Sequence, residues 1–237
     1  VTTNAPLHTN FKLSPNGEFL GLYDAESPRH AMSQLAPQYP EQRNDYSYGL
    51  DAVGFWRYFA TPTPGASNGI GSIEGLVAAP HFSVGHGFFN APFDLHLTTA
   101  TPAATTRYTT NGSAPSLTQG YDYTGPLRSG RLTVLRAVAF KTGLLPSTIE
   151  TRTFLFLESV VTQPANPPGF PASWVSATAD YEVDPNVVNH PAYSNSFKGD
   201  LMSVPTISIV MDNDHLFSAT GIYANPGSSG IAWERPG

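Results

Sequence analysis

Residues 132–140 read LTVLRAVAF, and this stretch predicts a β-strand. Successive side chains of a strand point to opposite faces of the sheet. One face then carries Leu132, Val134, Arg136, Val138 and Phe140. The other face carries Thr133, Leu135, Ala137 and Ala139. Because both faces are mostly apolar, we expect this strand to lie in the centre of a sheet.

Shorter strand-like runs surround this stretch, at residues 93–98, 105–109 and 151–156. Turn-forming clusters at 111–115 and 141–143 separate them. Short strands at this spacing are typical of an immunoglobulin-like β-sandwich. We therefore predict such a sandwich over residues 76–157.

The first part of the chain also has the pattern of β-structure. Residues 11–23 place two alternating apolar runs around Pro15-Asn16-Gly17, which predicts a β-hairpin. A further strand is expected at 54–59. The Pro- and Gly-rich residues 61–69 can neither continue a strand nor begin a helix, so we place a domain boundary near residue 70.

The last part, residues 158–237, begins with a linker in which four prolines keep residues 163–171 extended. Asp184 followed by Pro185 is a signal for the start of a helix. The expected elements are short helices at 184–189 and 193–202, a strand at 204–211, and a short strand into a turn at 221–227. We interpret this part as a linker followed by a short, incomplete α+β segment.

The composition narrows the fold class and the partners. The 22 prolines and 21 glycines among 237 residues exclude a mostly helical protein, and we predict a mainly β fold. With 12 Lys and Arg against 18 Asp and Glu, no basic surface is available for nucleic acid. No apolar stretch is long enough to span a membrane, and without cysteine there are no disulfides or thiolate metal sites. The oligomeric state is left open.

Carboxylate groups are the first candidates for a metal site. Asp212 and Asp214 could hold Ca²⁺ or Mg²⁺ through oxygen ligands, or could cap a turn. A second alternating acidic group consists of Asp180, Glu182 and Asp184. It could form a metal or acid/base site, or it could be a solvated edge. The further acidic positions of an EF-hand loop are absent, so neither group makes a strong metal motif.

The histidines show no ligand spacing, and they are His8, His30, His81, His86, His96, His190 and His215. They form either a zinc site assembled from distant residues or, by default, surface and hydrogen-bonded core side chains. A Gly-x-Ser-x-Gly nucleophile motif and a phosphate-binding loop are also absent. We therefore predict no catalytic residue, no cofactor-binding residue, no metal ligand and no cofactor.

Aromatic rings are candidate platforms for stacking on sugars, or they fill the cores of the modules. The rings concerned are Trp56, Trp174, Trp233, Tyr108, Tyr121, Tyr123 and Tyr181. A second surface feature is the sequon Asn111-Gly112-Ser113 on an expected turn, where glycosylation would fit in a eukaryotic secretory setting.

Three groups of motifs resemble known families. Residues 8–69 resemble the C-terminal half of a lamin-tail domain through HTNFKLS (8–14), GEFL (17–20), QRNDYSYG (42–49) and PTPGASN (62–68). Residues 80–156 resemble a chitobiase/β-hexosaminidase C-terminal module through TRYTTNGSAP (106–115), YTGPL (123–127) and VLRAVAF (134–140). Residues 204–236 resemble the opening of a spore-coat CotH-type kinase domain through VPTISIVMD (204–212), TGIYANP (220–226) and WERP (233–236).

These resemblances imply a piece of a large, multidomain, exported bacterial protein, extracellular or on the cell surface. The expected domains are a truncated lamin-tail-like β-sandwich over 1–70, an immunoglobulin-like sandwich over 76–157, and a linker with the start of a CotH-like domain over 158–237. The expected function is that of non-catalytic spacer or surface-anchoring modules. One alternative is part of a kinase whose nucleotide- and metal-binding residues follow residue 237, and another is a carbohydrate-binding module with a cell-surface or polysaccharide partner.

Overall fold

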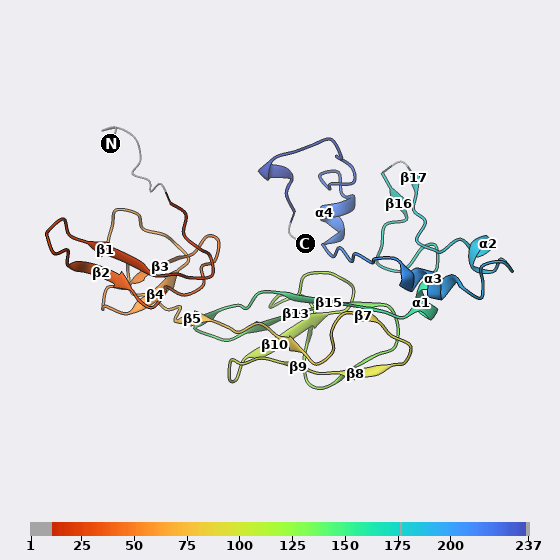
Figure 1. The fold of residues 1–237 in the computed structure, drawn as a ribbon, viewed down its shortest axis with the longest axis horizontal. Helices are drawn as coiled ribbons and strands as arrows, with labels where there is room; N and C mark the ends of the chain where they lie inside the picture. The colour runs from red at the N-terminus through yellow and green to blue at the C-terminus, as the bar shows by residue number, and fades with distance from the viewer. Residues whose placement is uncertain (1–10, 176, 236–237) are drawn as a thin grey trace. The chain divides into compact units, whose positions relative to one another are not determined.

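The computed structural model describes residues 11–175 and 177–235. The chain divides into two compact units, Val1–Gly75 and Leu76–Gly237. Strand β5 (Gly75–Leu76) lies at the boundary between them. Among the described residues, far more lie in strands than in helices, and the helices are short, so the predicted mainly β fold is confirmed (Figure 1).

The first unit consists of two antiparallel hairpins. Their strands are β1 (Leu20–Tyr23) with β2 (Ala31–Leu35), and β3 (Ser47–Leu50) with β4 (Trp56–Phe59). Two buried tyrosines, Tyr39 and Tyr58, form the centre of this small unit, and Tyr58 is only 2% exposed. The Tyr58 hydroxyl donates a hydrogen bond to the Glu41 carbonyl at 2.5 Å. Burial raises the pKa of Tyr58 to about 12.

The predicted hairpin over residues 11–23 is wrong in its pairing. The turn forms, with Gly17 at φ +93° and its N–H bonded to the Ser14 carbonyl at 3.3 Å. However, residues 11–13 form no strand, and β1 pairs with β2 instead. The backbone around the turn bonds to a different segment, because Tyr39 N–H donates to the Glu18 carbonyl at 3.0 Å.

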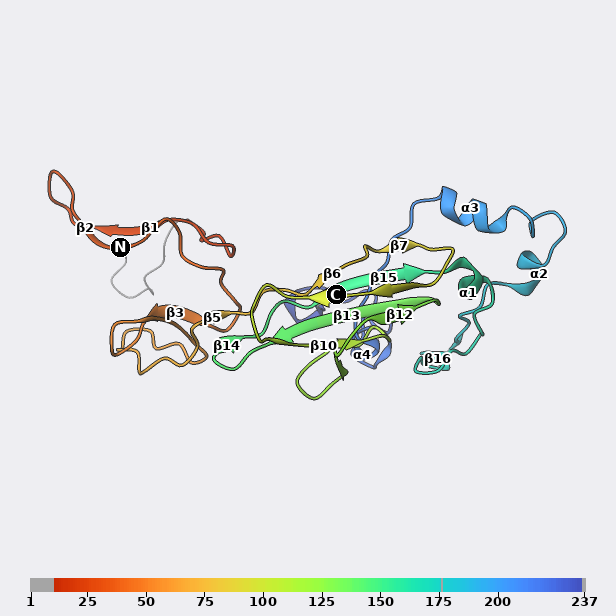
Figure 2. The same ribbon diagram turned by 90° about the horizontal axis from the view of Figure 1, so that it is seen from below.

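The second unit is built on a five-stranded sheet in the order β11-β10-β13-β15-β7. Figure 2 shows β10, β13, β15 and β7 of this sheet. Its strands are β7 (Gly87–Phe88), β10 (Thr105–Thr109), β11 (Tyr121–Asp122), β13 (Thr133–Phe140) and β15 (Glu150–Leu155). Strand β13 pairs antiparallel with β10 on one side and with β15 on the other. The predicted central strand is therefore confirmed.

Shorter strands cover one face of this sheet and complete a β-sandwich. They are β6 (His81–Phe82), β8 (Phe93–Leu95), β9 (Leu97–Thr98) and β12 (Leu127–Ser129). The short strand β14 (Leu144–Leu145) follows β13 in the chain. The buried core between the layers consists of Phe82, Leu95, Leu97, Leu135, Ala137, Phe154 and Phe156. Leu135 and Ala137 come from one face of β13, as the alternation requires.

Residues 204–211 are extended but form no strand, so that prediction is wrong. They lie against the opposite face of the sheet, where the Ser208 and Thr153 hydroxyls are 2.7 Å apart. The alternate side chains Ile207 and Ile209 point away from it and are 84% and 73% exposed. Residues 204–211 pair with no strand among the described residues, so the segment contacts the sheet through side chains and not through a ladder.

The remaining elements of the chain are short. They are α1 (Leu157–Val161), β16 (Ser173–Trp174), β17 (Ala177–Thr178), α2 (Pro185–Val188), α3 (Phe197–Ser203), α4 (Asn213–Phe217) and a 3₁₀ turn η1 (Ile231–Trp233). The helices expected near 184–189 and 193–202 are present as α2 and α3. In the described part of the chain, no helix is long and apolar enough to cross a bilayer.

The short strand expected at 221–227 is absent, and turns take its place. The reason is that the backbone folds back onto α4. Ile222 N–H donates to the His215 carbonyl at 2.9 Å, and Tyr223 N–H donates to the Leu216 carbonyl at 3.0 Å. These bonds use the groups that a neighbouring strand would need.

We predict that the sandwich core dominates the stability of the second unit. Leu95→Ala should lower the free energy of unfolding by about 2–5 kcal/mol, because Leu95 is 1% exposed in the core. The matched change Leu117→Ala, at a site 69% exposed, should alter it by less than about 0.5 kcal/mol. Urea unfolding followed by tryptophan fluorescence measures both, and similar losses in the two variants would contradict the assignment of the core.

Candidate functional site

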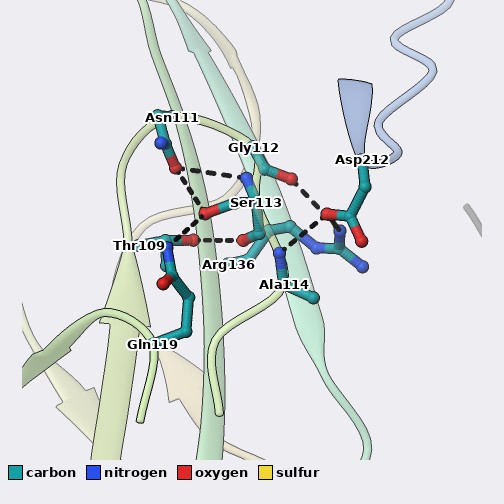
Figure 3. Close-up of polar contacts among 8 residues, drawn as sticks. All are labelled: Thr109, Asn111, Gly112, Ser113, Ala114, Gln119, Arg136 and Asp212. Atoms are coloured by element: carbon teal, nitrogen blue, oxygen red, sulfur yellow. Dashed lines mark hydrogen bonds and ion pairs between the residues drawn. The ribbon is translucent and has the colours of Figure 1, made fainter. Parts of the chain in front are cut away.

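A polar cluster joins the sandwich to the C-terminal segment (Figure 3). At its centre, Asp212 Oδ1 accepts a hydrogen bond from Ala114 N–H at 3.0 Å and lies 3.9 Å from Arg136 Nη1. The same Arg136 nitrogen donates to the Gly112 carbonyl at 3.1 Å. Asp212 is thus connected to β13 and to the loop after β10, which lies 98 residues earlier in the chain.

The loop at 111–114 is shaped by its own side chains. Asn111 Oδ1 accepts hydrogen bonds from Ser113 N–H at 3.2 Å and from Ser113 Oγ at 2.7 Å, and Thr109 Oγ1 donates to the Ser113 carbonyl at 2.5 Å. Gly112 adopts φ +83°, a conformation that favours glycine. These contacts fix the Gly112 carbonyl and the Ala114 N–H that face Arg136 and Asp212. The exposed Asn111 of the sequon is thus part of a structured turn.

Arg136 is the electrostatic centre of the cluster. The residue is only 7% exposed, so its guanidinium is largely removed from water. A buried cation is costly unless it is paired and hydrogen-bonded. The Gly112 carbonyl and the Asp212 carboxylate supply this compensation, while Nε has no hydrogen-bond partner among the described residues. This arrangement holds two segments together.

The structure shows what the two predicted acidic groups do. Asp212 is the N-cap residue of α4, but its side chain makes no capping bond, so the turn-cap alternative is wrong for Asp212. With Asp214 and His215 it lines a polar pocket of about 400 Å³ beside the cluster. Asp184 caps α2 by accepting from Asn186 N–H at 2.8 Å, and Asp180 accepts from Glu182 N–H at 3.2 Å.

Within residues 11–175 and 177–235, one group of three possible metal ligands is found, and the sequence spacing did not suggest it. Asp24, Glu26 and His30 lie in the loop between β1 and β2, with their ligand atoms within 4.8 Å of one another. His30 Nδ1 is 3.1 Å from Asp24 Oδ2 and 3.7 Å from Glu26 Oε2. These residues could offer two oxygens and one nitrogen to a cation. The group is largely exposed, and the two ion pairs account for its geometry.

Among the described residues, no other histidine belongs to a group of three possible metal ligands. His81 lies in β6, His86 lines a shallow pocket at β7 and β15, and His190 contacts the ring of Tyr193. His8 lies outside the described residues.

Most of the rings named from the sequence are packed against other groups. Trp56 stacks on Tyr48, Arg235 lies over Trp233, and Tyr123 packs on the sandwich core. The rings of Phe170, Trp174, Tyr181, Phe217 and Tyr223 contact one another in the C-terminal segment. Tyr121 is the most accessible of the named rings in the described part of the chain, at 66% exposed.

A groove of about 980 Å³ lies between β12, β13 and the proline-rich linker. Core residues such as Leu135 and Phe154 line its apolar interior, and Phe170 and Tyr181 of the C-terminal segment line it from the other side. Two arginines, Arg128 and Arg131, also line it. The sequence analysis did not identify this groove, because its walls come from segments far apart in the chain.

Comparison with protein families places one part of the chain. Residues 84–151 match the chitobiase/beta-hexosaminidase C-terminal domain, and this range contains β7 to β14 and the start of β15. The module expected there is therefore supported. Comparisons with curated proteins and with solved structures found no match. The lamin-tail and CotH-type resemblances on either side stay predictions.

We predict that acid removes the stabilisation that the Asp24 carboxylate gives to the β1–β2 loop. The N–H of His30 is the main reason why the pKa of Asp24 lies below the ordinary value of an aspartate. A depressed pKa means that the stabilisation is complete above the ordinary value, near pH 3.9, and is lost as the pH falls through the folded-state value. NMR titration of the Asp24 carboxyl carbon and of the His30 amide should show this. In the Asp24→Asn variant, the amide signal of His30 should no longer shift over this pH range. An Asp24 pKa at or above the ordinary value would contradict the prediction.

Proposed function

We propose that the chain is a non-catalytic structural part of an exported protein, in which the sandwich serves as a platform for the C-terminal segment. The carrying observation is the buried Arg136 that pairs with Asp212. A buried arginine that bonds to a loop carbonyl and to a distant carboxylate is suited to fixing segments in place. The family match over residues 84–151 is compatible with a structural module.

The proposal extends to location and chemistry. We place the protein outside the cell or on its surface, on the basis of the matched module, the low content of charged residues and the resemblance of the three parts to exported proteins. We assign no cofactor and no catalytic role to the described residues, because the polar groups of the central cluster are engaged in holding segments together.

The platform proposal is tested by separating the C-terminal segment from the sheet. Asp212→Ala removes the acceptor of the Ala114 N–H and the partner of Arg136, and should lower the free energy of unfolding by about 1–3 kcal/mol. The Ala114 amide should also exchange faster with solvent. The matched variant Asp214→Ala, two residues on and exposed, should change stability by less than about 0.5 kcal/mol. Unchanged exchange at Ala114 in Asp212→Ala would contradict the proposal.

Polysaccharide binding is a second candidate function. The observation that favours it is the exposed ring of Tyr121, which lies 5.8 Å from the ring of Tyr108, so that two neighbouring rings are available for stacking. We predict that the chain is retained on a cell-wall polysaccharide or on chitin, and that Tyr121→Ala reduces retention several-fold. The control variant Tyr193→Ala removes a similarly exposed ring elsewhere. No retention of the unaltered chain would end this candidate.

The kinase alternative concerns residues 204–236 and rests on their resemblance to the start of a CotH-type domain. No residue of this chain receives a role in phosphate transfer under this alternative. Turnover of ATP by this chain in the presence of Mg²⁺ would contradict the non-catalytic proposal and favour the alternative.

A further inference from the structure

The groove between the sandwich and the proline-rich linker has an interior with a distinct chemistry. Its deepest lining comes from Leu95, Leu135 and Phe154, which are at most 2% exposed. Phe170 and linker prolines supply further apolar wall. Ligand pockets of proteins are mostly apolar and measure about 300–1,000 Å³, so this groove falls in their range.

One buried polar group in the groove lacks a partner. Ser129 of β12 lines the groove and is 8% exposed, and its hydroxyl makes no hydrogen bond to any residue that the structure describes. Buried hydroxyls are normally hydrogen-bonded, because an unmade bond is costly. The Ser129 hydroxyl is therefore available to a polar atom of a ligand in the groove.

The charges around the groove have one sign. Arg128 and Arg131 line it, and no acidic side chain does, although the whole chain has a formal net charge of −6. Arg128 is engaged with Asp94 at 3.2 Å on the surface. Arg131 has no ion pair among the described residues and is exposed to solvent. A guanidinium in this position is suited to a carboxylate, which it can bind through two parallel hydrogen bonds.

We infer that this groove binds an amphipathic anion, a small ligand with an apolar body and one carboxylate. The apolar body lies on the partly exposed apolar wall that Leu127, Leu132 and Phe170 provide, and the carboxylate meets Arg131 at the rim. The Ser129 hydroxyl donates to the ligand or accepts from it. A polysaccharide fits the groove less well, because its hydroxyls would be buried against apolar core residues without partners. Tyr121 does not line the groove, although Tyr108, the neighbouring ring, does.

The test compares two probes of equal length, octanoate and 1-octanol, added to the full chain and followed by backbone amide NMR shifts. Both should shift the amides of groove residues, including Ser129 and Thr162. Octanoate should bind about tenfold more tightly, which is the size expected for one charge-assisted contact. Arg131→Gln should reduce octanoate binding to the level of octanol and leave octanol binding unchanged. Arg29→Gln, an exposed arginine in the first unit, should affect neither.

Several outcomes would overturn the inference. These are shifts that fall outside the groove, equal affinities for the two probes, or an Arg131→Gln effect on both. An acidic disaccharide such as digalacturonate that shifts the same amides as strongly as octanoate would show that an apolar body is not required. None of these results bears on the Asp212→Ala test, so failure here leaves the platform proposal standing.

Discussion

Strand β13 carries buried side chains on both of its faces. Leu135 and Ala137 are buried in the sandwich core, while Arg136 and Val138, which alternate with them, are 7% and 4% exposed on the opposite face. An ordinary two-layer sandwich covers only the inner face of each sheet. The outer face of this sheet therefore needs a further layer, and residues 204–212 contribute to it through Ser208 and Asp212.

Because the outer face of the sheet is covered by the C-terminal segment, the chain after Gly75 forms one compact unit. The sequence, in contrast, suggests a separate segment after the linker. Residues 163–171 are not extended throughout, because Phe170 N–H donates to the Pro167 carbonyl at 3.3 Å in a turn, with Gly169 at φ +88°. The chain later returns to the sheet at residues 204–212. The contact with the 111–114 loop bridges 98 residues, and such a long-range pairing has no signature in the local sequence. Its cost in chain entropy has to be offset by contacts such as that of Arg136 with Asp212.

The parts of the fold that follow from local patterning could be predicted. The alternation in 132–140 gave the central strand, and Asp184-Pro185 gave the start of α2. The failures occurred where tertiary contacts decide the outcome. Residues 204–211 have the residues of a strand, but they lie against a face of the sheet, where Ser208 meets Thr153 through side chains, and they pair with no strand among the described residues. The proximity of Asp24, Glu26 and His30 depends on how the β1–β2 loop closes, which spacing alone does not specify.

The position of the groove follows from the same constraint on β13. The core layer covers one face of the sheet, the C-terminal segment covers parts of the other, and the groove borders the sandwich beside β12 and β13. At one end, β12 and β13 leave core residues within reach of the groove, and Arg131 lies between these two strands in the chain. The linker that returns the chain to the outer face also forms a wall of this groove. The covering of the outer face and the formation of the groove are therefore two results of the same chain path.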